Sequence, residues 1–140
     1  MIKKLSERGV DAIVRLHELA IFPLWDRLKR KYTREEIREF VVKTFKKGDV
    51  YGYVESNKLA GCVGIQKVGA ITEVVFLLVN PDLQKKGIGR KLIGFVEQEN
   101  LGNMRLSVLI DNPSLGFYKK MGYKIIGEGD GKYLMEKKLL

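Results

Sequence analysis

The sequence predicts a single α/β domain in which a mixed sheet has helices on both faces. The chain has 140 residues, the length of one domain that buries a core without disulfides or metals. Its hydrophobic patterns follow the order strand, two or three helices, three strands, helix, strand, helix and two strands. The run Ile71–Val79 is apolar at even and odd positions from Val74 onward, which is typical of a central strand covered on both faces.

Helical patterns dominate the first third of the chain. Apolar residues at helical spacing predict a helix that ends near Ile21, and Pro23 separates it from a further helical piece. Thr33 and Glu36 form a capping-box pattern that opens another helix. The elements expected here are a strand at 2–5 and helices ending near residue 21, around 24–28 and from 33 to about 47.

Turn residues separate the strands of the remaining chain. Ser56-Asn57-Lys58 and Gly129-Asp130-Gly131 are hairpin turns by residue type, and Gly69-Ala70 marks a turn before the central strand. The elements expected here are strands at 50–55, 59–66 and 71–79, a helix from 88 to about 102, a strand at 105–110, a short helix at 113–121 and strands at 123–127 and 133–139.

Composition excludes several classes of protein. The formal net charge of +9 attracts polyanions, and by itself it does not separate nucleic acid, a membrane surface and a phosphorylated cofactor. One cysteine, Cys62, and one histidine, His17, exclude a disulfide framework and a Cys- or His-rich metal site, so no metal is expected. The N-terminus lacks the features of a signal peptide, and the longest apolar run is too short to span a bilayer, so we expect a cytoplasmic protein without a membrane anchor.

A basic, glycine-containing loop follows the central strand. A strand that runs through such a loop into a helix presents unpaired N–H groups at the positive end of the helix dipole, which suits a phosphate. A solvated basic turn at a helix start explains the glycine spacing equally well. A Walker loop and a dinucleotide fingerprint are both incomplete here, the latter because Leu92 stands where a third small residue is needed. The segment is Gln84-Lys85-Lys86-Gly87-Ile88-Gly89-Arg90.

Two ordered motifs extend this observation to a family. Gln84-Lys85-Lys86-Gly87-Ile88-Gly89 matches Gln/Arg-x-x-Gly-x-Gly/Ala after a strand ending in Val-x-Pro. The segment from Asn112 to Tyr123 is similar to Asn-x-x-Ala-x-x-Phe-Tyr-x-x-x-Gly-Phe, with departures at Gly116, beside the usual alanine position, and at Tyr123. Glu73 to Gly127 thus resembles the GNAT superfamily of acyl-CoA-dependent N-acyltransferases.

This resemblance implies a fold, an activity and a cosubstrate. The fold is one GNAT domain over 1–140, with a mixed, mostly antiparallel sheet of about seven strands and helices on both faces. The activity is transfer of an acetyl group from acetyl-CoA to a primary amine, by direct attack in a ternary complex. The alternative is a non-catalytic CoA-binding or nucleic-acid-binding module on the same fold. The four basic residues of 83–91 carry nearly half of the excess charge, which weakens the nucleic-acid alternative without excluding it.

The resemblance also implies how coenzyme A is bound. Backbone of the central strand at Leu77, Leu78 and Val79 pairs with the pantetheine arm, and Asn112 contacts coenzyme A while also fitting an N-cap. A backbone N–H near Leu78 or Val79, where the family strand bulges, is the expected oxyanion donor. The residues whose backbone binds the pyrophosphate are Gln84, Lys85, Lys86, Gly87, Ile88, Gly89 and Arg90.

Glu73 and Tyr118 are the candidate catalytic pair. An alkylammonium has a pKa of about 10.4, so the reaction needs a proton acceptor. Glu73 is the only ionisable residue in 71–79, and in several members of the family a glutamate six residues before the valine of Val-x-Pro is the general base, often through water. The two-residue period places it on the face of Val75, Leu77 and Val79. Tyr118 of the Phe-Tyr pair is the family's acid for the leaving thiolate. The alternatives are a charged residue at a strand entry for Glu73 and a core aromatic for Tyr118.

The acceptor side is less defined by sequence. In the family the first helices and their connection roof the substrate pocket, so candidate lining residues here are Phe22, Trp25, Asp26 and Tyr32. Trp25 fits a core position equally well, His17 is expected at the surface or in the core, and Cys62 is expected to be inert. The acceptor is a small-molecule or protein amine whose identity stays open. Many relatives form homodimers through their last strands, which here are 123–140.

Overall fold

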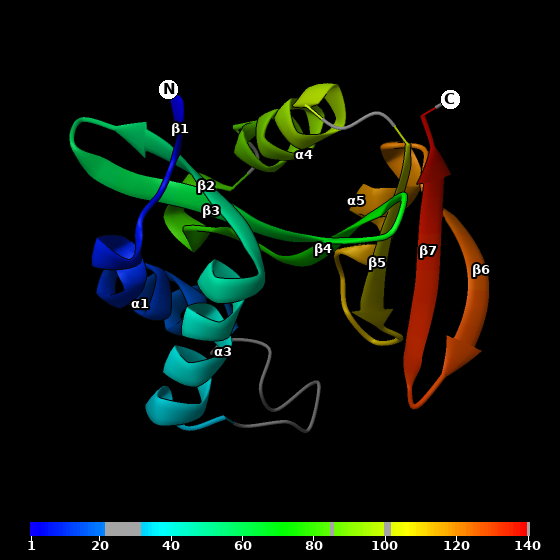
Figure 1. The fold of residues 1–140 in the computed structure, drawn as a ribbon, viewed down its shortest axis with the longest axis horizontal. Coiled ribbons are helices and arrows are strands. Elements are labelled where there is room, and N and C mark those ends of the chain that lie inside the picture. The colour runs from blue at the N-terminus through cyan, green and yellow to red at the C-terminus, as the bar shows by residue number, and fades with distance from the viewer. Residues whose placement is uncertain (22–31, 85, 100–101, 140) are drawn as a thin grey trace.

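A seven-stranded mixed sheet is the frame of the molecule (Figure 1). The computed structural model describes residues 1–21, 32–84, 86–99 and 102–139. The strand order is β1-β2-β3-β4-β5-β7-β6, and each neighbouring pair is antiparallel except β4 and β5, which are parallel. The elements are β1 (Ile2–Lys4), η1 (Glu7–Gly9), α1 (Val10–Ile21), α3 (Arg34–Lys47), β2 (Gly48–Glu55), β3 (Lys58–Val68), β4 (Ile71–Val79), η3 (Pro81–Leu83), α4 (Ile88–Glu99), β5 (Asn103–Leu109), α5 (Leu115–Lys120), β6 (Lys124–Gly129) and β7 (Lys132–Lys138).

The predicted fold class is confirmed, with helices on both faces of the sheet. Helices α1 and α3 lie on one side of β2 to β4, and α4 lies on the other (Figure 1). Each side has its own apolar cluster. The α1/α3-side cluster includes Ile13, Val41, Cys62, Phe76 and Leu78, and the α4-side cluster includes Val63, Val74, Ile88, Leu92 and Met104.

A local signal in the sequence accounts for the start of α3. Thr33 Oγ1 accepts the N–H of Glu36 at 3.1 Å, and Glu36 Oε1 accepts the N–H of Thr33 at 3.0 Å, which completes the predicted capping box. These hydrogen bonds lower the pKa of Glu36. The ion pair Arg34–Glu18, at 2.9 Å, then joins α3 to α1. The predicted helical piece at 24–28 lies outside the described residues.

The predicted hairpin turns are present between β2 and β3 and between β6 and β7. Ser56 and Asn57 have φ angles of 51° and 60°, and Asp130 and Gly131 have 54° and 73°. Two successive residues with positive φ match the right-handed twist of the strands that they join. Both turns therefore set the register of their hairpins from local sequence.

A β-bulge in β4 reverses which side chains share a face of the sheet. Gly64 of β3 pairs with Phe76 and Ile65 pairs with Val74, so Val75 is an extra residue in β4. Val74 belongs to the α4-side cluster, whereas Phe76 belongs to the α1/α3-side cluster. Even-numbered residues therefore change sides at the bulge.

This bulge corrects the predicted position of Glu73. The two-residue period without a bulge puts Glu73 on the face of Leu77 and Val79, but both of these pack against the α4-side cluster. Glu73 lies opposite to its neighbour Val74 and hence faces the side of α1 and α3, with Phe76. The bulge also lies at Val75 and not near Leu78 or Val79, where we expected it.

His17 is a half-buried side chain of α1 that packs edge-on against Phe40 of α3, with ring centroids 6.3 Å apart. Both ring nitrogens are buried without a hydrogen-bond partner among the described residues. Burial lowers the pKa of His17, because the charged imidazolium loses its hydration there. His17 is therefore neutral at pH 7.

Replacing His17 with Phe should make the protein's stability less dependent on pH. The lowered pKa means that unfolded His17 binds a proton more readily than folded His17, so the free energy of unfolding falls as the pH drops below about 6.5. The Phe variant has no group there to protonate, so its free energy of unfolding should not fall in this way. At pH 7 its free energy of unfolding should be higher by on the order of 1 kcal/mol, because no unpaired ring nitrogen is buried. Urea unfolding at pH 7.5 and pH 5.5 measures both effects, and an unchanged pH dependence would contradict the assignment.

Candidate active site

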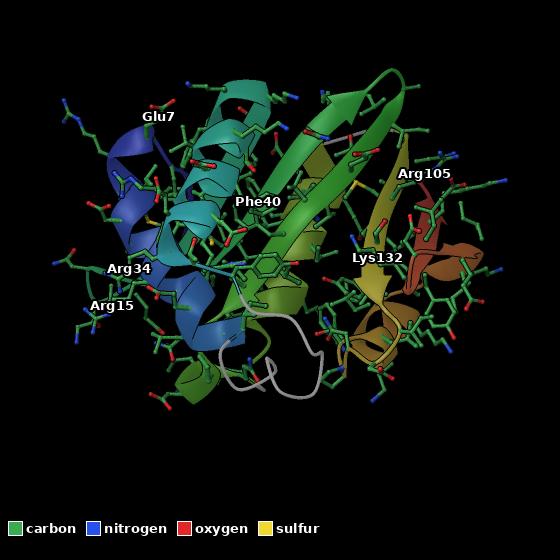
Figure 2. All side chains as sticks on the ribbon, turned by 90° about the horizontal axis from the view of Figure 1, so that it is seen from below. Glu7, Arg15, Arg34, Phe40, Arg105 and Lys132 are labelled. Atoms are coloured by element: carbon green, nitrogen blue, oxygen red, sulfur yellow. The ribbon has the colours of Figure 1, made fainter. Side chains whose placement is uncertain are left out.

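The parallel pairing of β4 and β5 ends early and opens the sheet. It extends only from Ile71–Asn103 to Val74–Leu106, after which the two strands run apart (Figures 1 and 2). From there to Val79, β3 is the only strand partner of β4 among the described residues. The second edge of β4 is therefore available to another main chain or to a ligand with amide groups.

Alternation along β4 determines which backbone groups face this open edge. The N–H of Asn80 donates to the Ala60 carbonyl of β3 at 2.8 Å. The Leu78 carbonyl oxygen also lies on the β3 side, 2.8 Å from the place that a Cβ on Gly61 would take. Since successive residues direct their polar groups to opposite edges, those of Leu77 and Val79 face the opening. Of the three residues predicted to meet pantetheine, these two present their main chain.

The predicted phosphate loop lies at the end of β4 and opens α4. The N–H of Lys91 is the first to donate within the helix, to the Gly87 carbonyl at 3.0 Å. The N–H groups of Ile88, Gly89 and Arg90 precede this donor and are unpaired within the helix. Gly87 has a φ of 79°, a left-handed conformation that favours glycine. Exposed Lys86 and Arg90 add positive charge, and Lys85 lies outside the described residues.

Helix α5 packs against the end of β4 and the predicted phosphate loop. A Cβ on Gly89 would lie 3.4 Å from Phe117 Cζ and 3.7 Å from Val79 Cγ2, so the loop, the end of β4 and α5 converge. Tyr118, the next residue, is 8% exposed and lies edge-on to Phe117, with ring centroids 5.2 Å apart. Burial raises the pKa of Tyr118 to about 12, which keeps its hydroxyl protonated and able to donate.

Asn112 takes a different structural role from the one predicted. The short helix begins at Leu115 rather than at Pro113, and its N-cap residue is Ser114. Asn112 Oδ1 accepts the N–H of Ser114 at 2.8 Å and so closes the turn before α5. The helix therefore begins two residues later than predicted, because Pro113 and Ser114 belong to this turn.

Glu73 lies across the sheet from Tyr118. Its carboxylate accepts a hydrogen bond from Gln66 Nε2 of β3 at 3.0 Å, and the side chain is half buried on the α1/α3 side. Tyr118 packs in the α4-side cluster. The proposed base and acid therefore approach the opening beside β4 from opposite faces of the sheet.

The acceptor side of the site contains an aromatic residue that the sequence analysis did not single out. Phe40 follows the apolar stripe of α3, yet it is 40% exposed and lies between α3 and the strands (Figure 2). Its ring centroid is 5.9 Å from that of Phe76, on the face of Glu73. Of the predicted lining residues, Tyr32 is exposed just before α3, and Phe22, Trp25 and Asp26 lie outside the described residues.

The remaining sequence predictions concern Cys62, metals and membranes. Cys62 is fully buried, and burial raises the pKa of its thiol, so it is inert as predicted. The described part of the chain contains no group of three or more histidine, cysteine, aspartate or glutamate side chains that could hold a metal ion. No helix in that part has the length and apolar character needed to cross a membrane.

Comparison with known proteins identifies the family. A family model described as an acetyltransferase (GNAT) domain matches residues 46–125. The chain belongs to the GNAT acetyltransferase family. The uncharacterised N-acetyltransferase YitH of Bacillus subtilis is 24% identical over 125 residues, which are 89% of this chain and 40% of YitH. The chain thus spans less than half the length of the curated relatives that it matches.

Solved structures share the fold of this GNAT chain. The PaiA N-acetyltransferase of Thermoplasma acidophilum, in complex with coenzyme A, matches with a TM-score of 0.84 and 19% identity over 99% of this chain and 98% of that chain. An aminoglycoside 6'-N-acetyltransferase complexed with coenzyme A matches with a TM-score of 0.80 and 18% identity, over 100% of this chain and 97% of that one. Both of those structures contain coenzyme A, and their similarity to this chain shows the shared fold.

Replacing Gly87 with Ala should weaken coenzyme A binding roughly fivefold to tenfold. An alanine at a φ of 79° costs roughly 1–2 kcal/mol, and the loop relieves this strain by moving its N–H groups. Gly94→Ala is the matched control, since an added Cβ meets nothing within 4 Å in the middle of α4 and should stabilise the helix by about 0.5–1 kcal/mol. Calorimetric titration with coenzyme A compares the two variants. Equal affinities would show that the conformation of the loop at Gly87 does not matter for binding.

Proposed function

We propose that the protein transfers an acetyl group from acetyl-CoA to a primary amine, by direct attack of the amine in a ternary complex. The observation that carries this proposal is the convergence of three features at one end of β4. These are the open backbone edge of Leu77 and Val79, the unpaired N–H groups at the start of α4, and the buried hydroxyl-bearing side chain of Tyr118. Each provides a group that amine acylation by a thioester requires.

The chain has the groups needed to hold both ends of coenzyme A. The N–H groups of Ile88, Gly89 and Arg90 suit the pyrophosphate, and Lys86 adds positive charge beside them. The open edge of β4 suits the amide groups of the pantetheine arm, which would pair with it as a further strand does. Acetyl-CoA would supply an activated acyl group as a thioester at this edge. The loop and the strand would fix its position relative to Glu73 and Tyr118.

Glu73 is proposed as the general base. It faces the α1/α3 side, where the amine would enter, and it accepts a hydrogen bond from the neutral side chain of Gln66. An incoming ammonium would give a proton to the carboxylate, directly or through water, and the freed lone pair would form the new carbon–nitrogen bond. Of the two expected oxyanion donors, Val79 directs its N–H toward the opening, whereas Leu78 directs its polar groups toward β3.

Tyr118 is proposed as the general acid on the opposite face. As the carbon–sulfur bond breaks, its phenolic hydroxyl would donate a proton to the thiolate, and the second proton that leaves the acylated nitrogen would restore the phenol. A donor must hold its proton at the working pH, and the raised pKa of Tyr118 meets this condition. The acceptor is proposed to be a small-molecule or protein amine that approaches past Phe40 and Phe76. The single domain over 1–140, the cytoplasmic location and the homodimer stay predictions.

A screen of thiol release from acetyl-CoA, across amines of different classes, tests the activity and identifies a substrate for the variants. With that amine, Tyr118→Phe should lower kcat by about 100-fold, because the thiolate leaves unprotonated. Coenzyme A affinity should stay nearly the same, since the ring remains in place. Tyr133→Phe, which removes a hydroxyl from β7 in the same cluster, should leave kcat unchanged. Full turnover by Tyr118→Phe would remove Tyr118 as the acid.

Glu73→Gln should lower kcat by about 100-fold and remove the acid limb of the pH–rate profile that reports the base. The amide keeps the shape of the side chain but accepts no proton. Turnover measured between pH 6 and pH 9 on the same amine gives the profile. Glu128→Gln, at an exposed acid of β6, is the matched control and should behave like the unchanged protein. A Glu73→Gln profile that overlays the original would show that another group accepts the proton.

A further inference from the structure

Four polar residues lie side by side across the sheet, on the face that carries Glu73. Gln66 of β3 pairs with Glu73 of β4, Glu73 with Arg105 of β5, and Arg105 with Glu136 of β7. Paired positions on neighbouring strands direct their side chains to the same face. Arg105 thus lies between two carboxylates, and it can satisfy either of them.

The structure shows which carboxylate Arg105 satisfies. Arg105 Nε donates to Glu136 Oε2 at 2.5 Å, and Asn103 Nδ2 lies 3.5 Å from Glu136 Oε1 (Figure 2 shows Arg105 beside β7). The Glu136 side chain is only 8% exposed and that of Arg105 is 35% exposed. Among the described residues, Glu73 forms no ion pair within 4.0 Å, and its hydrogen-bond partner is Gln66. The guanidinium of Arg105 therefore pairs with Glu136 of β7 and not with Glu73.

The burial of Glu136 explains why the guanidinium stays there. A carboxylate that loses its cation in a buried place costs several kcal/mol, whereas a half-buried one recovers part of that cost from water. Arg105 next to Glu73 would stabilise the ionised carboxylate and so make it a poorer proton acceptor. A base at this position therefore benefits from a competitor for Arg105 on the neighbouring strand.

We propose that Glu136 is a positioning residue that retains Arg105 on the β7 side and so leaves Glu73 free to accept the proton of the acceptor amine. The inference rests on the proposed role of Glu73 as the base. Asn103 supports it by donating to the second oxygen of Glu136. Gln66 completes the arrangement, because it orients Glu73 without adding charge.

Other titratable groups on this side of the sheet do not replace Arg105. His17 of α1 is neutral at pH 7, because burial lowers its pKa. The described residues contain no ion pair between Glu73 and a lysine. The lysines carried by the elements of this face are Lys3 of β1, Lys43, Lys46 and Lys47 of α3, Lys124 of β6, and Lys132 and Lys138 of β7.

The test compares a variant that releases Arg105 with one that also removes it. Glu136→Gln should lower kcat roughly tenfold and move the acid limb of the pH–rate profile to lower pH by about one unit, because the guanidinium turns to Glu73. The double variant Arg105→Gln/Glu136→Gln has no guanidinium to release, so its kcat and acid limb should return close to the original. Coenzyme A affinity should be the same in both variants. A purely structural role for the ion pair predicts that the double variant is no better than the single one, and this result would overturn the proposal.

Two further variants separate this inference from the proposed function. In a Glu73→Gln background, Glu136→Gln should have no additional effect on kcat, as expected if it acts through Glu73. If Glu73→Gln leaves the pH profile unchanged, the base assignment fails; if Glu73→Gln is impaired but folded Glu136→Gln keeps the original profile, only the role of Glu136 fails. Asn103→Leu loosens Glu136 more mildly and should shift the limb in the same direction, so it replaces Glu136→Gln if that variant does not fold. The exposed Glu128→Gln variant should leave the limb in place.

Discussion

Four residue pairs, from Ile71–Asn103 to Val74–Leu106, hold β4 and β5 together, and beyond them one edge of β4 has no strand partner in the part of the chain that the structure describes. A strand in the middle of a sheet normally satisfies both of its edges, because unpaired backbone groups away from water are costly. The groups of Leu77 and Val79 are therefore ready to accept a chain-like ligand. The start of α4 and the aromatic pair of α5 are packed around this same opening.

The bulge at Val75 determines which face of the sheet carries Glu73. Without it, Glu73 would face α4 and share its side of the sheet with Tyr118. With it, Phe76 and Leu78 complete the α1/α3-side cluster, and Glu73 faces the same side. In the proposed reaction, the amine and the leaving thiolate would exchange protons with groups on opposite faces of the sheet.

Polar networks support both halves of the site. The hydroxyl of Tyr123, which stands where the family motif has phenylalanine, donates to Glu97 Oε2 of α4 at 3.0 Å. Lys137 of β7 contacts the same carboxylate at 3.1 Å, so α4 is tied to the C-terminal strands. Tyr123 also packs against Tyr118, with ring centroids 6.0 Å apart. On the other face, Glu136 holds Arg105 and thereby defines the surroundings of Glu73.

The sequence by itself determined several features that depend on residues close together in the chain. The capping box at Thr33, the hairpin turn at Ser56-Asn57, the span of β4 and the glycine loop into α4 were all predictable, because each rests on local backbone geometry or on a short periodicity. The family motifs pointed to Glu73 and Tyr118 in the same way. Only the tertiary structure decided the face of Glu73, because the bulge at Val75 is a property of pairing with β3. Likewise, the choice of Arg105 between two carboxylates depends on β4, β5 and β7 lying side by side, and no local pattern in the chain records which carboxylate is buried.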